Sequence, residues 1–223
     1  MTDNWRRLDF FAGLDPAELD VFEQKVLLRR YRARQIIFLE GEPGNLVGFL
    51  LSGKVRLYRM SEEGREKTIH ILKPGDILGE SAYLDGGDHP VTAESLEESH
   101  LALFRHSDFR QLLNEHPHLA LHIVEKMNIR LRQAYRQIRN LALKDTYART
   151  TSRLFKLARD HGVSTDSGIL LNLSLTQSDL ANMVGTSRET VSRILNDLQR
   201  KGIIEMKRSK ITILDPERLR RYT

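Results

Sequence analysis

Residues 187–193 read Ser-Arg-Glu-Thr-Val-Ser-Arg and carry side chains that are suited to reading DNA bases. Arginine donates a bidentate pair of hydrogen bonds to guanine O6 and N7, and glutamate accepts one from cytosine N4. Arg188, Glu189 and Arg193 could therefore read G·C pairs, with Ser192 contacting a base or a phosphate. A glutamate among arginines would repel phosphates, so its presence favours contact with bases. We expect this face, with Ser187 at its start, to lie in the major groove of DNA.

Two short helices must position these side chains. Thr176 with Asp179 three residues later resembles a capping box that begins the first helix, and Gly185 supplies the tight turn that ends it. Thr186 or Ser187 caps the second helix. The second helix has one apolar, inward face formed by Val191, Ile194, Leu195 and Leu198. The spacing predicts a helix-turn-helix whose second helix is the recognition helix.

Residues 202–213 follow this helix pair and predict two short strands around a basic turn. Such a wing would place Lys207, Arg208 and Lys210 near phosphates. Thr176 and Gln177, at the start of the first helix, complete the set of candidate DNA contacts.

The charge of the chain is unevenly distributed. The formal net charge is +5, of which residues 1–143 contribute −1 and residues 144–223 contribute +6. A basic C-terminal segment after a nearly neutral one is typical of a nucleic-acid-binding module attached to another domain. A solvated basic surface is the alternative reading of charge alone.

Residues 34–103 differ from the C-terminal part in their periodicity. Short apolar or alternating runs are separated by glycine-centred turns about every 8 to 12 residues, which predicts a small antiparallel barrel or roll. A short helix over residues 16–26 should precede the roll, with Asp15 as its N-cap and Pro16 in its first turn.

After Asp108 the period becomes helical. Six apolar residues recur at spacings of 3 and 4, namely Val124, Met127, Leu131, Ala134, Ile138 and Leu141. This narrow a/d stripe favours pairing with an identical helix, and packing against the chain's own roll is the alternative. Residues 145–162 predict a further amphipathic helix, followed by a loop over 164–168 and a short strand over 169–173.

Composition excludes several classes of site. The 223 residues include no cysteine, which excludes disulfides, thiolate zinc sites, cysteine-ligated iron–sulfur clusters and cysteine nucleophiles. No ligand cluster with convincing spacing and no nucleophile motif is evident, so we expect neither a metal site nor an enzyme. No apolar run approaches the ~20 residues of a membrane span, and residues 1–14 lack the apolar core of a signal peptide. We therefore expect a cytoplasmic protein without a membrane partner.

Three motifs resemble the Crp/Fnr family of bacterial transcription regulators. They lie at residues 37–43 with 51–55, at 73–80, which read Lys-Pro-Gly-Asp-Ile-Leu-Gly-Glu, and at 187–193. The resemblance implies an α+β fold with an N-terminal β-roll of the cyclic-nucleotide-binding kind over residues 1–115, a dimerisation helix over 116–143 and a winged helix-turn-helix over 144–223. It also implies a homodimer, a palindromic site with TGA-type half-sites and RNA polymerase as a partner.

The effector is less well defined by the resemblance. In family members that bind cyclic nucleotides, a Gly-Glu pair is followed about ten residues later by Arg-Ser or Arg-Thr. These residues are needed because a cyclic phosphate binds to the guanidinium group of an arginine and to a hydroxyl. This chain keeps Gly79-Glu80, but residues 88–92 read Asp-His-Pro-Val-Thr, and Ala134-Tyr135 replaces the expected Thr-Ser pair. These differences disfavour cyclic AMP. The residues we assign to the effector pocket are Gly79, Glu80, Ser81, His89, Pro90, Val91, Thr92, Arg130, Ala134 and Tyr135.

Other effectors remain open at this stage. Residues 88–97 are similar to the Fnr and nitric-oxide-responsive branches, but the Fnr cluster needs cysteines that are absent. A haem-based gas sensor with a histidine ligand, an organic effector and no effector at all are the remaining alternatives. A rival from another class is a small-molecule-binding module whose C-terminal part contacts proteins and does not act on DNA.

Overall fold

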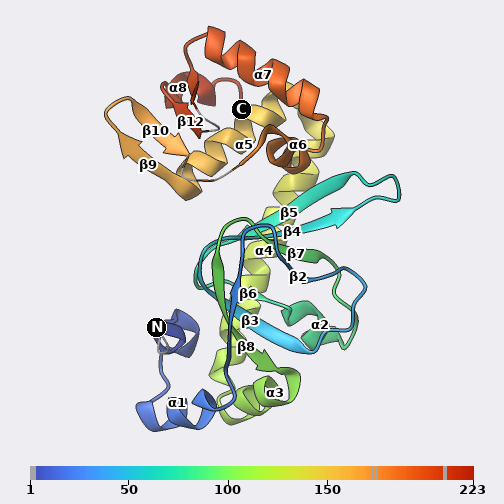
Figure 1. Ribbon diagram of the computed structural model, residues 1–223, viewed down its shortest axis with the longest axis vertical. Helices are drawn as coiled ribbons and strands as arrows, with labels where there is room; N and C mark the ends of the chain where they lie inside the picture. Colours follow the sequence, from blue (N-terminus) through green and yellow to red (C-terminus); the bar gives the residue numbers. More distant parts are fainter. Residues whose placement is uncertain (1–3, 172, 174, 208–209) are drawn as a thin grey trace. The chain divides into compact units, whose positions relative to one another are not determined.

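The computed structural model describes residues 4–171, 173, 175–207 and 210–223 (Figure 1). The predicted wing residue Arg208 lies outside the described residues. The chain divides into two compact units. The N-terminal unit comprises residues 1–59 and 68–131, and the C-terminal unit comprises residues 60–67 and 132–223. The boundaries expected at residues 115 and 143 stay predictions for independently folding domains.

The N-terminal unit contains the predicted β-roll. Its strands form two four-stranded sheets with the orders β1-β8-β3-β6 and β2-β7-β4-β5. Antiparallel pairing joins β3 to both β6 and β8, and joins β7 to both β2 and β4. The strands are β1 (Leu27–Tyr31), β2 (Ile36–Phe38), β3 (Leu46–Ser52), β4 (Val55–Met60), β5 (Glu66–Leu72), β6 (Ile77–Leu78), β7 (Thr92–Ser95) and β8 (Ser99–Arg105).

Strand β3 is buried on both of its faces because the side chains of a strand alternate in direction. Val47 and Phe49 pack in an aromatic cluster with Trp5, whereas Leu50 packs inside the roll. The aromatic cluster also involves residues of the helical elements η1 (Asn4–Arg7), η2 (Asp9–Phe11), α1 (Pro16–Glu23), α3 (His106–Glu115) and α4 (His118–Leu143). Two hydrophobic cores therefore meet on a single strand.

The start of α1 confirms the sequence prediction. Asp15 is its N-cap: the Oδ1 atom accepts a hydrogen bond from the Glu18 backbone at 2.9 Å, and the Glu18 side chain reciprocates. Pro16 occupies the first turn. The helix ends at Glu23, three residues before the predicted end, where the backbone N–H of Lys25 turns back to the Phe22 carbonyl.

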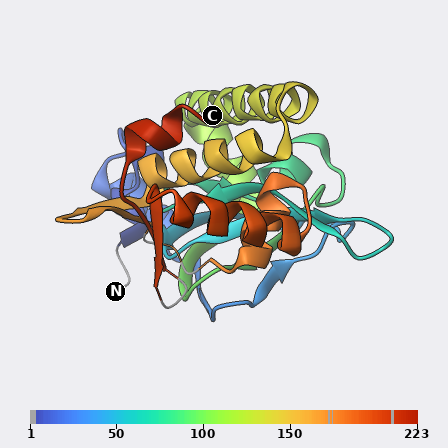
Figure 2. The same ribbon diagram turned by 90° about the horizontal axis from the view of Figure 1, so that it is seen from above.

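The C-terminal unit packs three helices together beside a small sheet (Figure 2). This sheet has four strands in the order β11-β12-β10-β9. The helix pair comprises α6 and α7, and β11 and β12 form the predicted wing. The elements are α5 (Thr146–His161), β9 (Gly162–Thr165), β10 (Gly168–Leu171), α6 (Gln177–Val184), α7 (Arg188–Arg200), β11 (Ile204–Lys207), β12 (Lys210–Ile213) and α8 (Pro216–Arg220).

Strand β9 corrects one expectation, because part of the predicted loop over residues 164–168 is a strand. It pairs antiparallel with β10, with Thr165 opposite Gly168. The hydroxyl of Thr165 donates to the Gly168 carbonyl at 2.9 Å, and Gly168 adopts a φ of +138°, which favours glycine. The polar sequence of residues 164–168 predicts only a loop, because the pairing of β9 with β10 is not visible in these residues.

Candidate nucleic-acid interface and effector site

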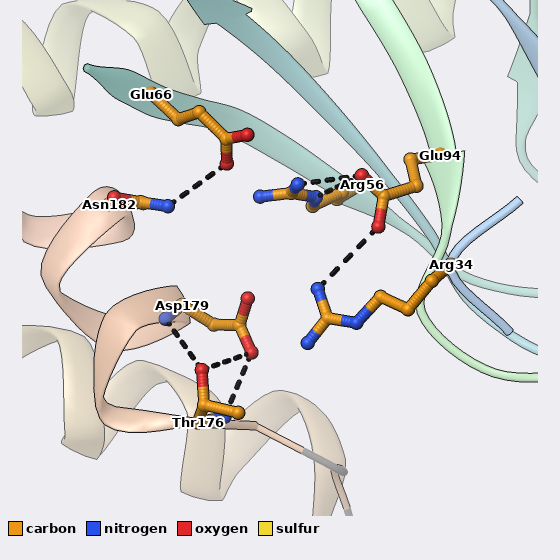
Figure 3. A network of polar contacts seen from close by, with 7 residues as sticks. All are labelled: Arg34, Arg56, Glu66, Glu94, Thr176, Asp179 and Asn182. Carbon is orange, nitrogen blue, oxygen red and sulfur yellow. Dashed lines mark hydrogen bonds and ion pairs between the residues drawn. The ribbon is translucent and has the colours of Figure 1, made fainter. Parts of the chain in front are cut away.

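The helix-turn-helix begins with a complete capping box on α6 (Figure 3). The Thr176 hydroxyl accepts from the Asp179 backbone at 3.1 Å, and Asp179 accepts from the Thr176 backbone at 2.8 Å. The same Thr176 hydroxyl also donates to Asp179 at 2.8 Å. Both of its hydrogen-bonding roles are thus used locally, so the structure gives this candidate DNA contact a capping role.

The turn and the start of α7 follow from two further residues. Gly185 has a φ of +78°, a left-handed conformation that an L side chain adopts only with strain, and it ends α6. Ser187 is the N-cap of α7, because its hydroxyl accepts from the Thr190 backbone at 3.2 Å. The choice between Thr186 and Ser187 is thereby resolved.

Helix α7 has the two faces that the sequence predicts. Val191, Ile194, Leu195 and Leu198 are buried. On the opposite face Arg188, Glu189 and Arg193 are exposed, and Ser192 is half-buried. These four line a shallow groove with three further residues, Gln177, Asn196 and Arg200.

Asn196 and Arg200 are candidate contacts that the sequence reading missed. The signal was present, since residues 189, 193, 196 and 200 are spaced 4, 3 and 4 apart and so share one helix face. Asparagine is a bidentate partner for adenine, and arginine binds guanine or phosphate. The groove thus contains side chains that could contact A·T pairs as well as G·C pairs.

The charge of Glu189 is stabilised by the N-terminus of α7. Its pKa is lowered first by a hydrogen bond from its own backbone N–H, then by the Ser187 side chain and by the charge of Arg188. The carboxylate therefore stays ionised and acts as an acceptor, which is the form that cytosine N4 requires.

A cluster of three side chains fixes α7 against α5. The Tyr147 hydroxyl donates to Asp197 at 2.8 Å, and the Lys201 ammonium lies 2.7 Å from the same carboxylate oxygen. The hydrogen bond with Lys201 is the main reason that the pKa of Asp197 is lowered, and the pKa of Lys201 is raised in turn. These contacts therefore tie the C-terminal end of the recognition helix to α5.

The wing is basic but partly neutralised. Lys207 lies 2.7 Å from Glu205 on the same strand, and its side chain is highly exposed. Lys210 is also exposed. Both lysines are accessible to phosphates, as the wing prediction requires.

In the N-terminal unit, the Gly-Glu pair forms a compact charged site. Gly79 has a φ of +78°, and a Cβ there would collide with the Leu46 carbonyl oxygen. Glu80, only 3% exposed, accepts a hydrogen bond from Arg130, which also donates to the Ile77 carbonyl. The second carboxylate oxygen, Oε2, is buried without a hydrogen-bond partner among the described residues.

Residues 89–92, which the sequence also assigns to the effector pocket, contain the buried His89. His89 stacks on Phe38 with ring centroids 3.8 Å apart, and burial is the main reason that its pKa is lowered. The Thr92 hydroxyl accepts from the Glu40 backbone at 3.0 Å. Ser81 and Val91 are half-buried and Pro90 is exposed. This segment therefore presents no cation beside Glu80, because its one titratable ring is kept neutral.

The last two effector candidates, Ala134 and Tyr135, are exposed on the part of α4 that belongs to the C-terminal unit. The contacts within the N-terminal unit join Glu80 to Arg130 but do not include this pair. Their assignment to the effector pocket stays a prediction.

A second ion pair, which the sequence reading missed, links the strands of the roll. Arg56 on β4 and Glu94 on β7 are cross-strand partners, and Arg56 Nη2 lies 2.6 Å from the carboxylate (Figure 3). Arg34 Nη1 lies 3.5 Å from the other oxygen of Glu94. The sequence signal that could have predicted this ion pair is the opposite charge of two residues at facing positions of β4 and β7.

The apolar stripe of α4 is largely exposed. Val124, Leu131, Ile138 and Leu141 are each at least 48% exposed, and Ala134 is exposed as well. Met127 differs: it is half-buried and packs against the aromatic cluster of the N-terminal unit. The exposed stripe includes two more residues, Leu121 and Tyr135. Met127 therefore differs from the other expected seam residues, because its side chain packs on the core of its own chain.

Comparisons with known proteins agree with this architecture. Residues 28–116 match the cyclic nucleotide-binding domain family, and residues 148–222 match the Crp-like helix-turn-helix domain family. The Cyclic AMP receptor protein of Thermus thermophilus is 34% identical over 88% of both chains. The Global nitrogen regulator of Nostoc sp. PCC 7120 is 32% identical over 93% of this chain and 96% of the relative.

Solved structures show the same fold. A transcriptional regulator of the CRP/FNR family from Thermus thermophilus superposes with a TM-score of 0.76, at 28% identity, over 88% of this chain and 97% of the other. CooA from Carboxydothermus hydrogenoformans gives a TM-score of 0.75, also at 28% identity, over 89% and 88%.

The fold and the exposed recognition helix define a DNA-binding regulator with an effector-binding domain of the cyclic-nucleotide-binding kind. The chain belongs to the Crp/Fnr family of transcriptional regulators, whose members bind DNA and act as dimers. Within the described residues, no helix is long and apolar enough to cross a membrane, and no three potential metal ligands cluster.

Proposed function

We propose that the chain is a homodimeric regulator, and not an enzyme, that reads a two-fold symmetric DNA site through Arg188, Glu189 and Arg193. The observation that carries this proposal is the placement of all three on the exposed face of α7, while the opposite face is buried. Arginine and ionised glutamate on one helix face match the edges of G·C pairs in the major groove.

The exposed stripe of α4 supports the dimer. Large apolar side chains exposed at a/d spacing favour pairing with an identical helix, because pairing removes them from water. Two recognition helices must lie about 34 Å apart to read successive major grooves, so an effector that changes the packing of the seam would change DNA affinity.

The test is a binding measurement on a palindromic duplex with TGA-type half-sites and on a scrambled duplex of equal length. Arg193→Ala should lower the preference for the palindrome by about 5-fold to 150-fold for each half-site, corresponding to about 1–3 kcal/mol per bidentate contact. Salt-dependent binding to the scrambled duplex should remain. Arg220→Ala, an exposed arginine on α8, is the control. An unchanged preference in the Arg193 variant would refute the assignment of readers.

We infer that the effector of the roll differs from a cyclic nucleotide, although relatives carry names such as Cyclic AMP receptor protein. The specific observation is that Arg130 is hydrogen-bonded to Glu80, while residues 88–92 offer only a buried, neutral histidine as a base. A cyclic phosphate would therefore meet the carboxylate of Glu80 without a cationic fork of its own.

Calorimetric titration with cyclic AMP tests this inference, and we expect no binding at micromolar nucleotide. Tight binding that sharpens DNA recognition would overturn it. An absorption spectrum of the purified protein separates the alternatives, since a Soret band would indicate haem. In vitro transcription from a promoter with the palindromic site tests the proposed action on RNA polymerase.

A further inference from the structure

A cleft in the C-terminal unit lies between the end of α4 and one face of α5. We call it the α4–α5 cleft. Its volume is about 260 Å³, which suits a small ligand or the charged part of a larger one. Its lining comprises Lys67, residues of the last three turns of α4, Lys144, one face of α5, the end of α6 and the last residue of the chain.

The charge of this lining is strongly one-sided. Eight of the lining residues are lysine or arginine, and none is aspartate or glutamate. On α5, residues 149, 153 and 156 are spaced 4 and 3 apart, so these cations share one helix face. They line the cleft together with Arg136 and Arg139 near the end of α4 and with Lys144 just after it. Like charges held together repel one another, and the repulsion grows as water is excluded.

Several polar groups in the cleft are also unsatisfied by the protein. Arg149 donates through its two terminal nitrogens to the Lys144 carbonyl and the Thr146 hydroxyl, but its Nε is buried without a partner among the described residues. The side-chain oxygens of Gln133 and Asn140 are also buried and unpaired there, but they are acceptors and need a donor, so of these groups Arg149 alone favours an anion. Buried polar groups without partners are rare in native structures and call for an explanation.

Burial lowers the pKa of three of these cations. It is the main cause that lowers the pKa of Arg153 to about 10 and that of Lys67 to about 8, and Arg153 and Arg149 contribute further to the shift of Lys67. The pKa of Lys156 is lowered for the same reasons, burial first and the charge of Arg153 second. A multivalent anion in the cleft would offset both the desolvation and the repulsion.

The dimer does not supply that anion. Residues 126–144 contain no aspartate or glutamate, so a second copy of this stretch brings no carboxylate to the seam. In the heptad set by Val124 and Leu131, Arg136, Arg139 and Asn140 occupy positions outside a and d. Most of the cleft side of α4 is therefore distinct from the apolar stripe, and the two surfaces share Leu141.

We propose that the α4–α5 cleft binds a small anion that carries phosphoryl groups. Arginine and lysine are the residues that bind phosphoryl oxygens, and eight of them surround a cavity of ligand size. Two adjacent phosphoryl groups match the extent of the charge better than one. Free pyrophosphate and a nucleoside diphosphate share this chemistry. This site is independent of the base-reading face of α7 and of the effector site beside Glu80.

The experiment is calorimetric titration of the full-length protein with pyrophosphate, ADP and adenosine at pH 7 and about 0.1 M salt. We expect pyrophosphate and ADP to bind at one site per chain, with dissociation constants on the order of 0.1 mM or tighter, and adenosine not to bind. Arg153→Gln with Lys156→Gln should weaken binding at least about tenfold, because two phosphoryl contacts are lost.

Matched variants make the result interpretable. Arg220→Gln with Arg221→Gln removes the same charge from exposed positions of the same unit, and should leave pyrophosphate binding within about twofold. Arg136→Gln with Arg139→Gln changes only exposed side chains of the cleft and should reproduce the loss even if the α5 variant fails to fold.

Three outcomes would overturn the proposal. The first is no binding of pyrophosphate at millimolar concentration, and the second is equal weakening in the cleft and control variants, which would indicate unspecific attraction. The third is a decrease in the salt dependence of binding to scrambled DNA that occurs only in the cleft variants, which would assign the cleft to the DNA backbone. Sequence preference on the palindrome is measured separately, so failure here is distinguishable from failure of the base readers.

Discussion

In the N-terminal unit the carboxylate of Glu80 is buried and hydrogen-bonded to Arg130, whereas on α7 Arg188, Glu189 and Arg193 are all exposed. A buried charge is tolerated only when it is paired, because removing it from water is costly. An exposed charge keeps its hydration until a partner displaces it. Charged side chains that stabilise the fold are thus buried and paired, whereas charged side chains that can bind a macromolecule are exposed. The half-buried cations Arg149, Arg153 and Lys156 of the α4–α5 cleft, whose lining includes no carboxylate, belong to neither group.

The largest effect should come from breaking the buried pair. Arg130→Met leaves Glu80 buried without its cation and should lower the free energy of unfolding by about 3 kcal/mol at neutral pH. Urea unfolding followed by the fluorescence of Trp5, which is buried in the aromatic cluster of the same unit and is the single tryptophan, measures this. Adding Glu80→Gln should recover part of the loss. An unchanged midpoint would show that the pair is not needed for stability.

Removing an exposed charge should affect recognition and leave stability nearly unchanged. Glu189→Ala should reduce the penalty for a substituted base pair at its position by about 1–3 kcal/mol. Binding to scrambled DNA should become slightly tighter, because a carboxylate near phosphates is lost. Competition among duplexes with single base-pair changes measures both effects. If every substituted duplex kept its wild-type penalty, Glu189 would not be a reader.

The N-cap of α7 provides a smaller, purely local test. Ser187→Ala removes the acceptor for the Thr190 backbone and should cost about 1 kcal/mol of stability in the C-terminal unit. Hydrogen exchange of the first amides of α7 would detect the loss. Ser187→Asp, which keeps a capping oxygen, is the matched control and should restore protection. Equal exchange in the serine and alanine proteins would contradict the capping role.

The smallest effect should be the acid response of the roll. Burial lowers the pKa of His89 below its usual 6.5, so the unfolded chain binds a proton in a pH range where the folded chain does not. Stability should therefore fall as the pH decreases below about 6.5. His89→Phe, which keeps a ring against Phe38, should flatten this dependence between about pH 7.5 and 5.5 in the Trp5 unfolding assay. A slope identical to wild type would mean that other groups dominate.

Local signals in the sequence predicted the elements well where one or two side chains decide the structure. The caps formed by Asp15, Thr176 and Asp179 are each visible in four consecutive residues, and all are confirmed. The turn at Gly185 belongs to the same class. These features depend on hydrogen bonds to the nearby backbone, so distant parts of the chain do not alter them.

Features that depend on packing could not be predicted in the same way. Met127 fits the a/d spacing, but its long, flexible side chain packs into its own core. Strand β9 forms because the edge of β10 offers it a partner. The α4–α5 cleft joins cations that are spread over more than twenty residues, and their crowding becomes visible only when the two helices meet.

The hydrogen bonds that Asp197 forms with Tyr147 and Lys201 constrain how this regulator can be switched. Because these contacts tie the C-terminal part of α7 to α5, we expect a displacement of α5 to carry the reading helix with it. Lys144 and Asp145 connect the end of α4 to the start of α5 at Thr146, so we expect a movement of α4 to reach the reading helix through this short connection.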